Sequence, residues 1–89
     1  MDYGNEILKQ AYKHSLNHSE EINGSTSCGC FYCLEIFMPD EIWEWVPGEE
    51  TAFCPRCWID AVIGDRSGFP VNDRAFLRAL RTMYFKDLD

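Results

Sequence analysis

The sequence predicts a small α+β domain in which short strands and tight knuckles are combined with two to four helices. Three observations lead to this prediction. The chain has 89 residues, a length that buries a limited core and often needs an internal cross-link. Two Cys-x-x-Cys pairs lie in its middle, among breaker residues that leave room only for short elements. The last part of the chain has a two-sided helical pattern.

The first part of the chain, residues 1–22, is predicted to form an N-terminal helix, with its clearest periodicity over 4–18. Apolar residues recur there at helical spacing; they are Ile7, Leu8, Ala11, Tyr12 and Leu16. The polar run 23–27 reads Asn-Gly-Ser-Thr-Ser and is typical of a flexible linker. We therefore expect a separate unit over residues 28–89, which contains every cysteine.

Short elements are expected between and after the cysteine pairs. A helix is predicted over 39–45, because Pro suits a first helical turn and acidic residues suit the positive end of the helix dipole. A short strand over 51–53 should lead into the second cysteine pair. A short helix is predicted over 57–63 and ends before a glycine. The last, amphipathic helix is predicted over roughly 73–86, with Asn or Asp as its cap.

Four of the cysteines have the spacing of a metal site. They form the pairs Cys30-x-x-Cys33 and Cys54-x-x-Cys57, which residues 34–53 separate. Two residues between cysteines allow a tight turn to aim both sulfur atoms at one point, about 2.3 Å from a Zn²⁺ ion. Backbone N–H groups in such turns donate to the sulfurs and stabilise their charge. The sequence therefore predicts one structural Zn²⁺ held by these four ligands, although four thiolates also suit iron.

Cys28 is the fifth cysteine and is left over. It precedes Cys30 by one residue, which is too close for both sulfurs to join Cys33 easily on one ion. A ligand set with Cys28 in place of Cys30 stays open, as do reduced core cysteines or a redox dithiol instead of a metal. Cys28 itself is interpreted either as a small, partly buried residue at a strand entry or as a reactive thiol near a metal.

The same reasoning argues against an enzyme. A four-thiolate site leaves no coordination position for water or substrate, so it folds the chain rather than catalysing a reaction. Asp60, Asp65 and Asp73 are not spaced for general acid–base work. His14 and His18 are four residues apart, but the Glu of a His-Glu-x-x-His motif is missing, and a solvated polar face is expected there.

The charge of the chain is concentrated in its middle. The formal net charge is −7, and residues 35–65 hold eight acidic residues against Arg56 alone, a net of −7 for that segment. Such a body repels a nucleic-acid backbone. The longest apolar runs are far too short for a membrane span, and the first 21 residues lack the apolar core of a signal peptide. We expect a soluble, cytoplasmic protein.

An acidic and aromatic binding surface is predicted in this middle segment. The residues expected to form it are Trp43, Glu44, Trp45, Glu49 and Glu50. An exposed aromatic patch with an acidic rim is typical of an interaction surface. The predicted function is therefore non-enzymatic: a zinc-stabilised module that binds a protein partner. The alternative interpretation is that the Trp rings cover the zinc site and form a small core.

The last helix suggests a second function. Arg74, Arg78 and Arg81 fall within about 60° of one another around the helix axis. The simplest interpretation is that they are solvated or paired with the acidic middle. Alternatively, they contact an anion, and the protein is a nucleic-acid-associated regulator. A third possibility is an inhibitor or immunity-type protein whose acidic face blocks a basic partner.

The string over residues 29–71, which includes GCFYCLEIFMPDEIWEWV and TAFCPRCWIDAVIGDRSGFPV, resembles a family of small bacterial cytoplasmic proteins. Members share a Cys-x-x-Cys knuckle, an Ile/Trp-rich helix, a Cys-Pro-x-Cys knuckle and a D-x-VIG segment that follows it. The resemblance implies a metal site at the four paired cysteines but no established activity. It also includes a recurring loop at Asp60, Val62, Ile63, Gly64, Asp65, Ser67, Gly68 and Pro70. More loosely, the knuckle–helix order resembles zinc-ribbon and treble-clef domains.

Overall fold

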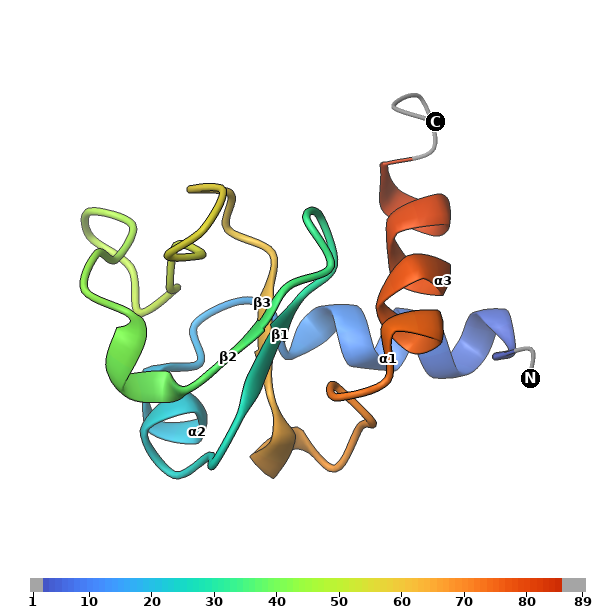
Figure 1. Ribbon diagram of the computed structural model, residues 1–89, viewed down its shortest axis with the longest axis horizontal. Helices are drawn as coiled ribbons and strands as arrows, with labels where there is room; N and C mark the ends of the chain where they lie inside the picture. The colour runs from blue at the N-terminus through green and yellow to red at the C-terminus, as the bar shows by residue number, and fades with distance from the viewer. Residues whose placement is uncertain (1–2, 86–89) are drawn as a thin grey trace.

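A three-stranded antiparallel sheet lies at the centre of the protein (Figure 1). The computed structural model describes residues 3–85. The strands are β1 (Cys28–Cys30), β2 (Ile36–Phe37) and β3 (Val62–Gly64), in the order β2-β1-β3. In this register Cys28 lies opposite Phe37 on one side and opposite Gly64 on the other. The small α+β class predicted from the sequence is confirmed.

Three helices surround the sheet in the described part of the chain. In Figure 1, α1 (Asn5–Lys13) and α3 (Arg74–Tyr84) lie to the right of the sheet, and the short α2 (Ser19–Asn23) lies to its left. Two single 3-10 turns, η1 (Pro39–Glu41) and η2 (Asp65–Ser67), complete the regular structure. Within residues 3–85, no helix has the length and apolar character needed to cross a membrane.

The last helix is two-sided, as predicted. Its fully buried residues are Phe76, Leu77 and Leu80. Asp73 caps the helix, because its side chain accepts the N–H of Ala75 at 2.9 Å. Tyr12 of α1 stacks on Tyr84 with ring centroids 4.0 Å apart, so burial of apolar surface joins the first and last helices. Residue 86, the predicted end of this helix, lies outside the described residues.

The segment before α3 crosses closely over β1 at Gly29. A Cβ atom on this residue would lie 2.6 Å from the carbonyl oxygen of Val71 and 3.0 Å from methyl groups of Leu77. Real Cβ atoms do not approach backbone oxygen so closely, so only glycine fits without movement of the chain. The glycine between Cys28 and Cys30 therefore allows the last helix to pack directly on the strand that carries these cysteines.

The N-terminal helix differs from the prediction. Helix α1 stops at Lys13, and a second helix begins at Ser19, with Asn17 in a left-handed conformation between them (φ 48°). The chain turns away there because its backbone bonds to a distant segment: the N–H of His18 donates to the carbonyl of Glu50 at 2.8 Å. Helical periodicity over 4–18 could not reveal this break, since its cause is a tertiary contact.

The polar run 23–27 is bonded to the loop that follows β3. Asp65 accepts the N–H of Thr26 at 3.0 Å, and its own N–H donates to the carbonyl of Ser27 at 2.9 Å. Hydrogen bonds that the Asp65 carboxylate accepts lower its pKa, first the one from the Thr26 hydroxyl and then the one from the Thr26 N–H. Gly64 is also required here, because a Cβ would meet the Ser25 hydroxyl. The loop around Asp65 thus has a structural role.

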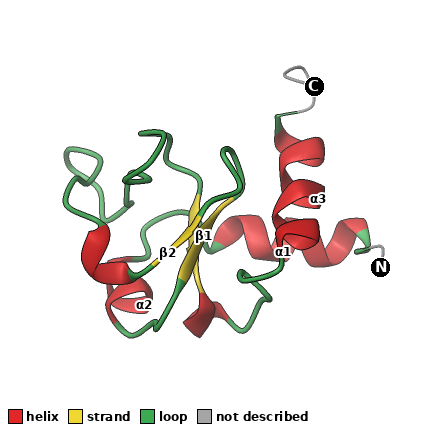
Figure 2. Ribbon diagram, viewed as in Figure 1, coloured by secondary structure: helices red, strands yellow, loops and turns green. Residues whose placement is uncertain are grey.

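Two helices predicted in the middle of the chain are wrong. After Pro39 there is one 3-10 turn, and residues 42–44 are not helical; Trp45 instead forms a β-bridge with Ala52, within the predicted strand 51–53. Residues 62–64, predicted to end a helix, form β3 and pair with β1. The buried Val62 and Ile63 are stabilised more by pairing in the sheet than they would be in a short helix, because a helix of this length is marginal and β-branched residues favour strands. Figure 2 shows how much of this region is loop.

Candidate metal centre

The four paired cysteines converge on one point. The sulfur atoms of Cys30, Cys33, Cys54 and Cys57 all lie within 4.8 Å of one another. The Sγ atoms of Cys30 and Cys57 are 3.6 Å apart, and those of Cys33 and Cys54 are 3.7 Å apart. A disulfide bond measures only about 2.05 Å between sulfurs, so these thiols are free. The four thiols could hold one metal ion.

The first cysteine pair forms a tight turn at the end of β1. The N–H of Leu34 donates to the carbonyl of Cys30 at 2.9 Å, and the N–H of Cys30 donates to the carbonyl of Glu35 at 3.0 Å. The N–H of Tyr32 donates to the sulfur of Cys30 at 3.4 Å. Leu34 closes the turn in the left-handed region, with φ 67°. We call this segment, residues 30–35, the first knuckle.

The second pair repeats these bonds in a different part of the chain. The N–H of Trp58 donates to the carbonyl of Cys54 at 3.0 Å, and the N–H of Cys54 donates to the carbonyl of Ile59 at 2.9 Å. The N–H of Arg56 donates to the sulfur of Cys54 at 3.3 Å. Trp58, like Leu34, has φ 67°. Residues 54–59, the second knuckle, therefore match the first knuckle bond for bond.

The donor set fits a tetrahedral ion. With metal–sulfur bonds of about 2.3 Å, the sulfurs of a regular tetrahedron lie about 3.8 Å apart, close to the 3.6 and 3.7 Å separations found between the two knuckles. Each knuckle aims an N–H group at the first of its two sulfurs, and such bonds stabilise thiolate charge. Both the geometry and the donor chemistry thus suit a cation bound by four thiolates.

The thiols influence one another's ionisation. The pKa of Cys54 is lowered to about 5, first by a hydrogen bond with the Cys30 thiol and then, against burial, by the N–H of Arg56. The pKa of Cys30 is raised by the same pairing and by burial. Burial raises the pKa of Cys57 to about 12. Several thiolates can coexist in so confined a space only when a cation neutralises their mutual repulsion.

Cys28 lies outside the cluster of four. It is fully buried in β1, opposite Phe37 and Gly64 in the sheet register, and its sulfur is not among the four that gather. Burial raises the pKa of its thiol to about 12, so the reactive thiolate is scarce at neutral pH. Its position fits a small core residue, the first of the two interpretations above, although it is more deeply buried than expected.

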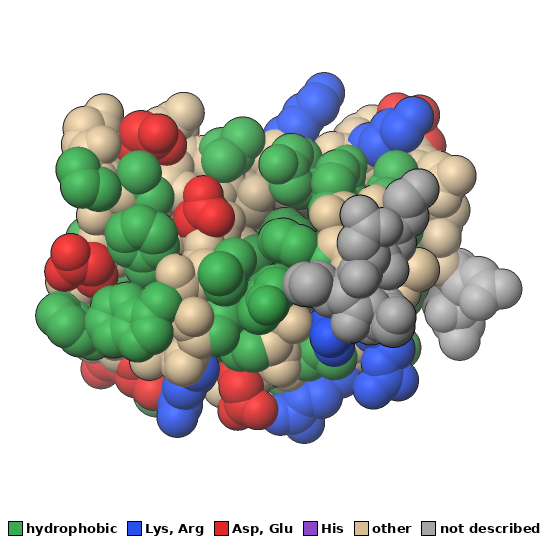
Figure 3. Space-filling model, turned by 90° about the horizontal axis from the view of Figure 1, so that it is seen from above, with side chains coloured by type: hydrophobic (Ala, Val, Ile, Leu, Met, Phe, Trp, Pro, Cys, Tyr) green, Lys and Arg blue, Asp and Glu red, His purple; other side chains and the backbone are tan. Residues whose placement is uncertain are grey.

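The residues predicted to form an acidic and aromatic surface are placed in two groups. Trp43 is 67% exposed and meets Trp58 edge-to-face, with ring centroids 4.9 Å apart, and Glu44 lies beside them. Trp45 is instead half-buried against the ring of His18. The remaining two carboxylates accept hydrogen bonds from neighbouring hydroxyls: Glu49 from Thr51 and Glu50 from Ser19. Figure 3 shows hydrophobic side chains across this face, with acidic ones among them on its left.

The three arginines of the last helix also differ from one another. Arg74 is exposed, and its Nε donates to the carbonyl of Leu34 in the first knuckle at 2.9 Å. Arg78 is exposed, and Arg81 is half-buried. At least one member of the predicted stripe therefore serves the fold, because it holds the end of the first knuckle against α3.

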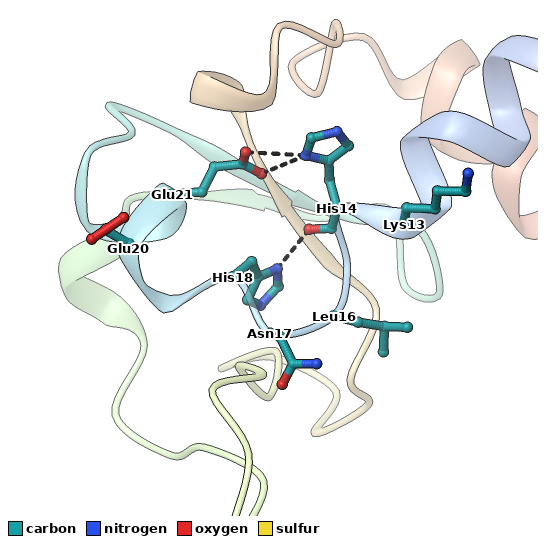
Figure 4. Close-up of a pocket in the computed structure, with 7 residues that line it drawn as sticks. All are labelled: Lys13, His14, Leu16, Asn17, His18, Glu20 and Glu21. Atoms are coloured by element: carbon teal, nitrogen blue, oxygen red, sulfur yellow. Dashed lines mark hydrogen bonds and ion pairs between the residues drawn. The ribbon is translucent and has the colours of Figure 1, made fainter.

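The two histidines do not share a metal position (Figure 4). The ring of His14 points toward Glu21, with its Nδ1 2.9 Å from the carboxylate. His18 was predicted on a solvated face, but it is only 4% exposed. Its Nδ1 donates to the carbonyl of His14 at 2.7 Å and its Nε2 accepts the N–H of Ala52 at 3.0 Å, which fixes a neutral tautomer. Burial accordingly lowers its pKa.

Comparison with known proteins adds no relative. No family model, curated protein or solved structure matches this chain. The resemblance to a bacterial knuckle family therefore stays a prediction. Two features of the site were missed in the sequence. The left-handed residues Leu34 and Trp58 had no signal, because glycine, the usual marker of that conformation, is absent.

Proposed function

We propose that the four paired cysteines hold one Zn²⁺ and that this ion has a structural role. The observation that carries the proposal is the bond-for-bond match of the two knuckles, with four sulfurs within 4.8 Å. Zinc prefers four sulfur ligands in tetrahedral sites of this kind. The ion would link β1 to the long segment that precedes β3. The predicted resemblance to a bacterial knuckle family implies the same four ligands.

A structural rather than catalytic role follows from the number of ligands. Four thiolates complete the tetrahedral coordination and leave no position for water or substrate. Metal binding is then coupled to folding, because the unfolded chain has no preformed site. We therefore propose that the protein is not an enzyme. Iron is the competing ion, since four thiolates suit either metal.

The test is native mass spectrometry of protein purified without added metal, before and after acid and chelator. We expect a mass increase of one zinc per chain, with elemental analysis to exclude iron. Cys54→Ser should lose the ion and the fold, whereas Cys28→Ser, at a buried cysteine outside the cluster, should keep the ion. A Cys54→Ser protein that retains both metal and fold would refute the assignment, as would a metal-free wild-type protein that remains folded.

We further propose that the module binds a protein through the acidic and aromatic surface of its middle segment. Support comes from the exposure of Trp43 (67%) and Trp58 (48%), which is high for aromatic residues. The net charge of −7 over residues 35–65 adds an acidic setting. We expect one dominant partner, lost when Glu44, Glu49 and Glu50 are replaced by Lys. Retention of that partner by the triple variant would contradict the proposed surface.

The two alternatives have less support. Arg74 donates to the carbonyl of Leu34 and Arg81 is half-buried, so the stripe offers less exposed arginine surface to a nucleic acid than predicted. That alternative predicts salt-sensitive retention on DNA, lost when Arg74, Arg78 and Arg81 become Ala, and no retention at low salt would exclude it. The inhibitor or immunity-type alternative shares the acidic surface and differs only in the consequence of binding, which is loss of the partner's activity. A cytoplasmic location is part of the same proposal.

A further inference from the structure

An open groove on the surface is lined by three aromatic rings and one carboxylate. Its residues are Trp43, Glu44, Phe53 and Trp58. The two indole rings stand at 89° to each other, with centroids 4.9 Å apart, and Trp43 is 67% and Trp58 48% exposed. Exposure of aromatic side chains to water is unfavourable in free energy, and an exposed aromatic patch is typical of a binding surface. The groove therefore combines exposed aromatic surface with a single negative charge.

The backbone explains why these four side chains meet. The N–H of Phe53 donates to the carbonyl of Glu44 at 3.0 Å, next to the bridge between Trp45 and Ala52. Residues directly opposite in an antiparallel pair place their side chains on the same face, so Glu44 and Phe53 lie side by side. Trp58 reaches the groove from the second knuckle, where its left-handed backbone closes the turn. The metal centre would thus position one wall of the groove.

The chemistry of this lining favours a cation. The face of an aromatic ring carries partial negative charge, and indole attracts cations more strongly than the other aromatic side chains. A carboxylate beside two indoles adds a full charge to that attraction. The only basic residue of the segment 35–65 is Arg56, and its guanidinium is bound to Glu41 at 2.7 Å rather than to the groove. The surrounding net charge of −7 over this segment attracts a positive ligand from a distance.

We propose that the groove binds the side-chain cation of a basic segment in a protein partner, with the guanidinium or ammonium group against the indole faces and next to Glu44. This inference rests on the proposed interaction function and names the chemistry of its partner. It also assigns separate roles within the predicted surface: Trp43 and Glu44 contact the partner's cation, whereas Trp45 supports the fold.

The experiment titrates the metal-bound chain with a short arginine-containing peptide and with the same peptide carrying neutral citrulline. Binding is followed by the NMR shifts of the two indole N–H groups. We expect the arginine peptide to shift both resonances to saturation and the citrulline peptide to leave them unchanged. Trp43→Ala and Glu44→Gln should each weaken binding about two- to fivefold or more. Trp43 is exposed, so its replacement leaves the fold intact, which the same spectra confirm.

Asp40→Asn is the matched control, because it removes one charge from the same acidic segment at an exposed residue outside the groove. It should retain nearly full affinity. Equal loss in Asp40→Asn and Glu44→Gln would show general attraction to an acidic body and overturn the inference. Absence of indole shifts in a folded, metal-bound protein would also overturn it, while the proposed module would stand. If the proposed zinc module itself is wrong, the same sample will contain no metal, and this outcome is distinct from the absence of indole shifts.

Discussion

The two knuckles have the same internal hydrogen bonds but very different surroundings. The first knuckle continues directly from β1, and the N–H of Phe31 donates to the carbonyl of Ala61, next to β3. Leu34 packs against the core, and Arg74 of α3 holds its carbonyl. Sheet, core and helix therefore all support this knuckle.

The second knuckle has fewer supports. It lies in a stretch of loop between η1 and β3, and Trp58 is 48% exposed and does not belong to the core. Its support comes from the bridge between Trp45 and Ala52, from His18 behind Ala52, and from the ion pair of Arg56 with Glu41. Identical local geometry thus does not imply equal stability. Within the second knuckle, Cys54 is fully buried and Ile59 packs against the core, and a metal would add a further link to the rest of the protein.

The largest effect is expected when the metal is removed. A structural zinc site contributes on the order of 10 kcal/mol, comparable to the whole stability of a small domain. We expect a strong chelator to unfold the chain, and the amide of Trp58 to lose protection before the amide of Leu34. Hydrogen exchange during stepwise chelation measures this order. Simultaneous loss at both amides would show that the two knuckles are equally dependent on the metal.

The next effect concerns His18, the buried support behind the second knuckle. His18→Ala leaves the N–H of Ala52 without its acceptor and should reduce the free energy of unfolding by about 1–3 kcal/mol. The matched change His14→Ala removes a partly exposed contact to Glu21 and should cost less than about 1 kcal/mol. Urea unfolding of both metal-bound variants compares them. Equal costs would mean that the His18 ring is not a significant support.

The same ring predicts a pH dependence. Burial lowers the pKa of His18 below its ordinary value of 6.5, so the folded state favours the neutral ring. The unfolded chain takes up a proton first as the pH falls. The stability that the buried, neutral His18 ring contributes is therefore fully present above pH 6.5. It is lost progressively as the pH falls from 6.5 to the lower pKa of the folded state. As the pH falls through this range, the free energy of unfolding should decline more steeply for the wild type than for His18→Ala. Parallel declines would contradict the predicted role of His18.

A smaller effect distinguishes the left-handed residues. The left-handed conformation destabilises a non-glycine residue by about 1–2 kcal/mol. Glycine avoids this strain, but its greater freedom in the unfolded chain lowers stability by about 0.5–1 kcal/mol. Trp58→Gly relieves this strain but loses the edge-to-face contact with Trp43, so the protein's free energy of unfolding should change by less than about 1 kcal/mol. Leu34→Gly should instead destabilise it by about 1–2 kcal/mol, because Leu34 packs against the core. Thermal unfolding of the two metal-bound variants compares the two losses of stability, and equal losses would remove the proposed difference between the knuckles.

The smallest effect is expected at Arg56. Its ion pair with Glu41 joins side chains that are 47% and 38% exposed, so solvent screens the attraction. Arg56→Ala should cost less than about 0.5 kcal/mol, and the difference should vanish in about 1 M salt. A double-mutant cycle with Glu41 isolates the pair. A coupling above about 1 kcal/mol would mean that the second knuckle is tethered more firmly than its exposure indicates.

Some features of this protein could be predicted from short stretches of sequence. The four ligand candidates follow from two Cys-x-x-Cys pairs, because two intervening residues suffice to build a knuckle. The last helix follows from its apolar spacing, and side-chain chemistry limited its cap to Asn72 or Asp73, of which the structure has Asp73. In each case the interactions that decide the structure lie within about one or two turns of the chain, so the local pattern contains them.

Other features depend on contacts between distant segments, and only the tertiary structure decided them. The break between α1 and α2 follows from the bonds of Asn17 and His18 to residues 50–52. Residues 62–64 become a strand because the open edge of β1 accepts them. The sequence by itself determined which chemical groups are present and how each knuckle can turn. Which histidine is buried, and how deeply Cys28 lies in the sheet, depended on long-range packing, whose energy no local pattern contains.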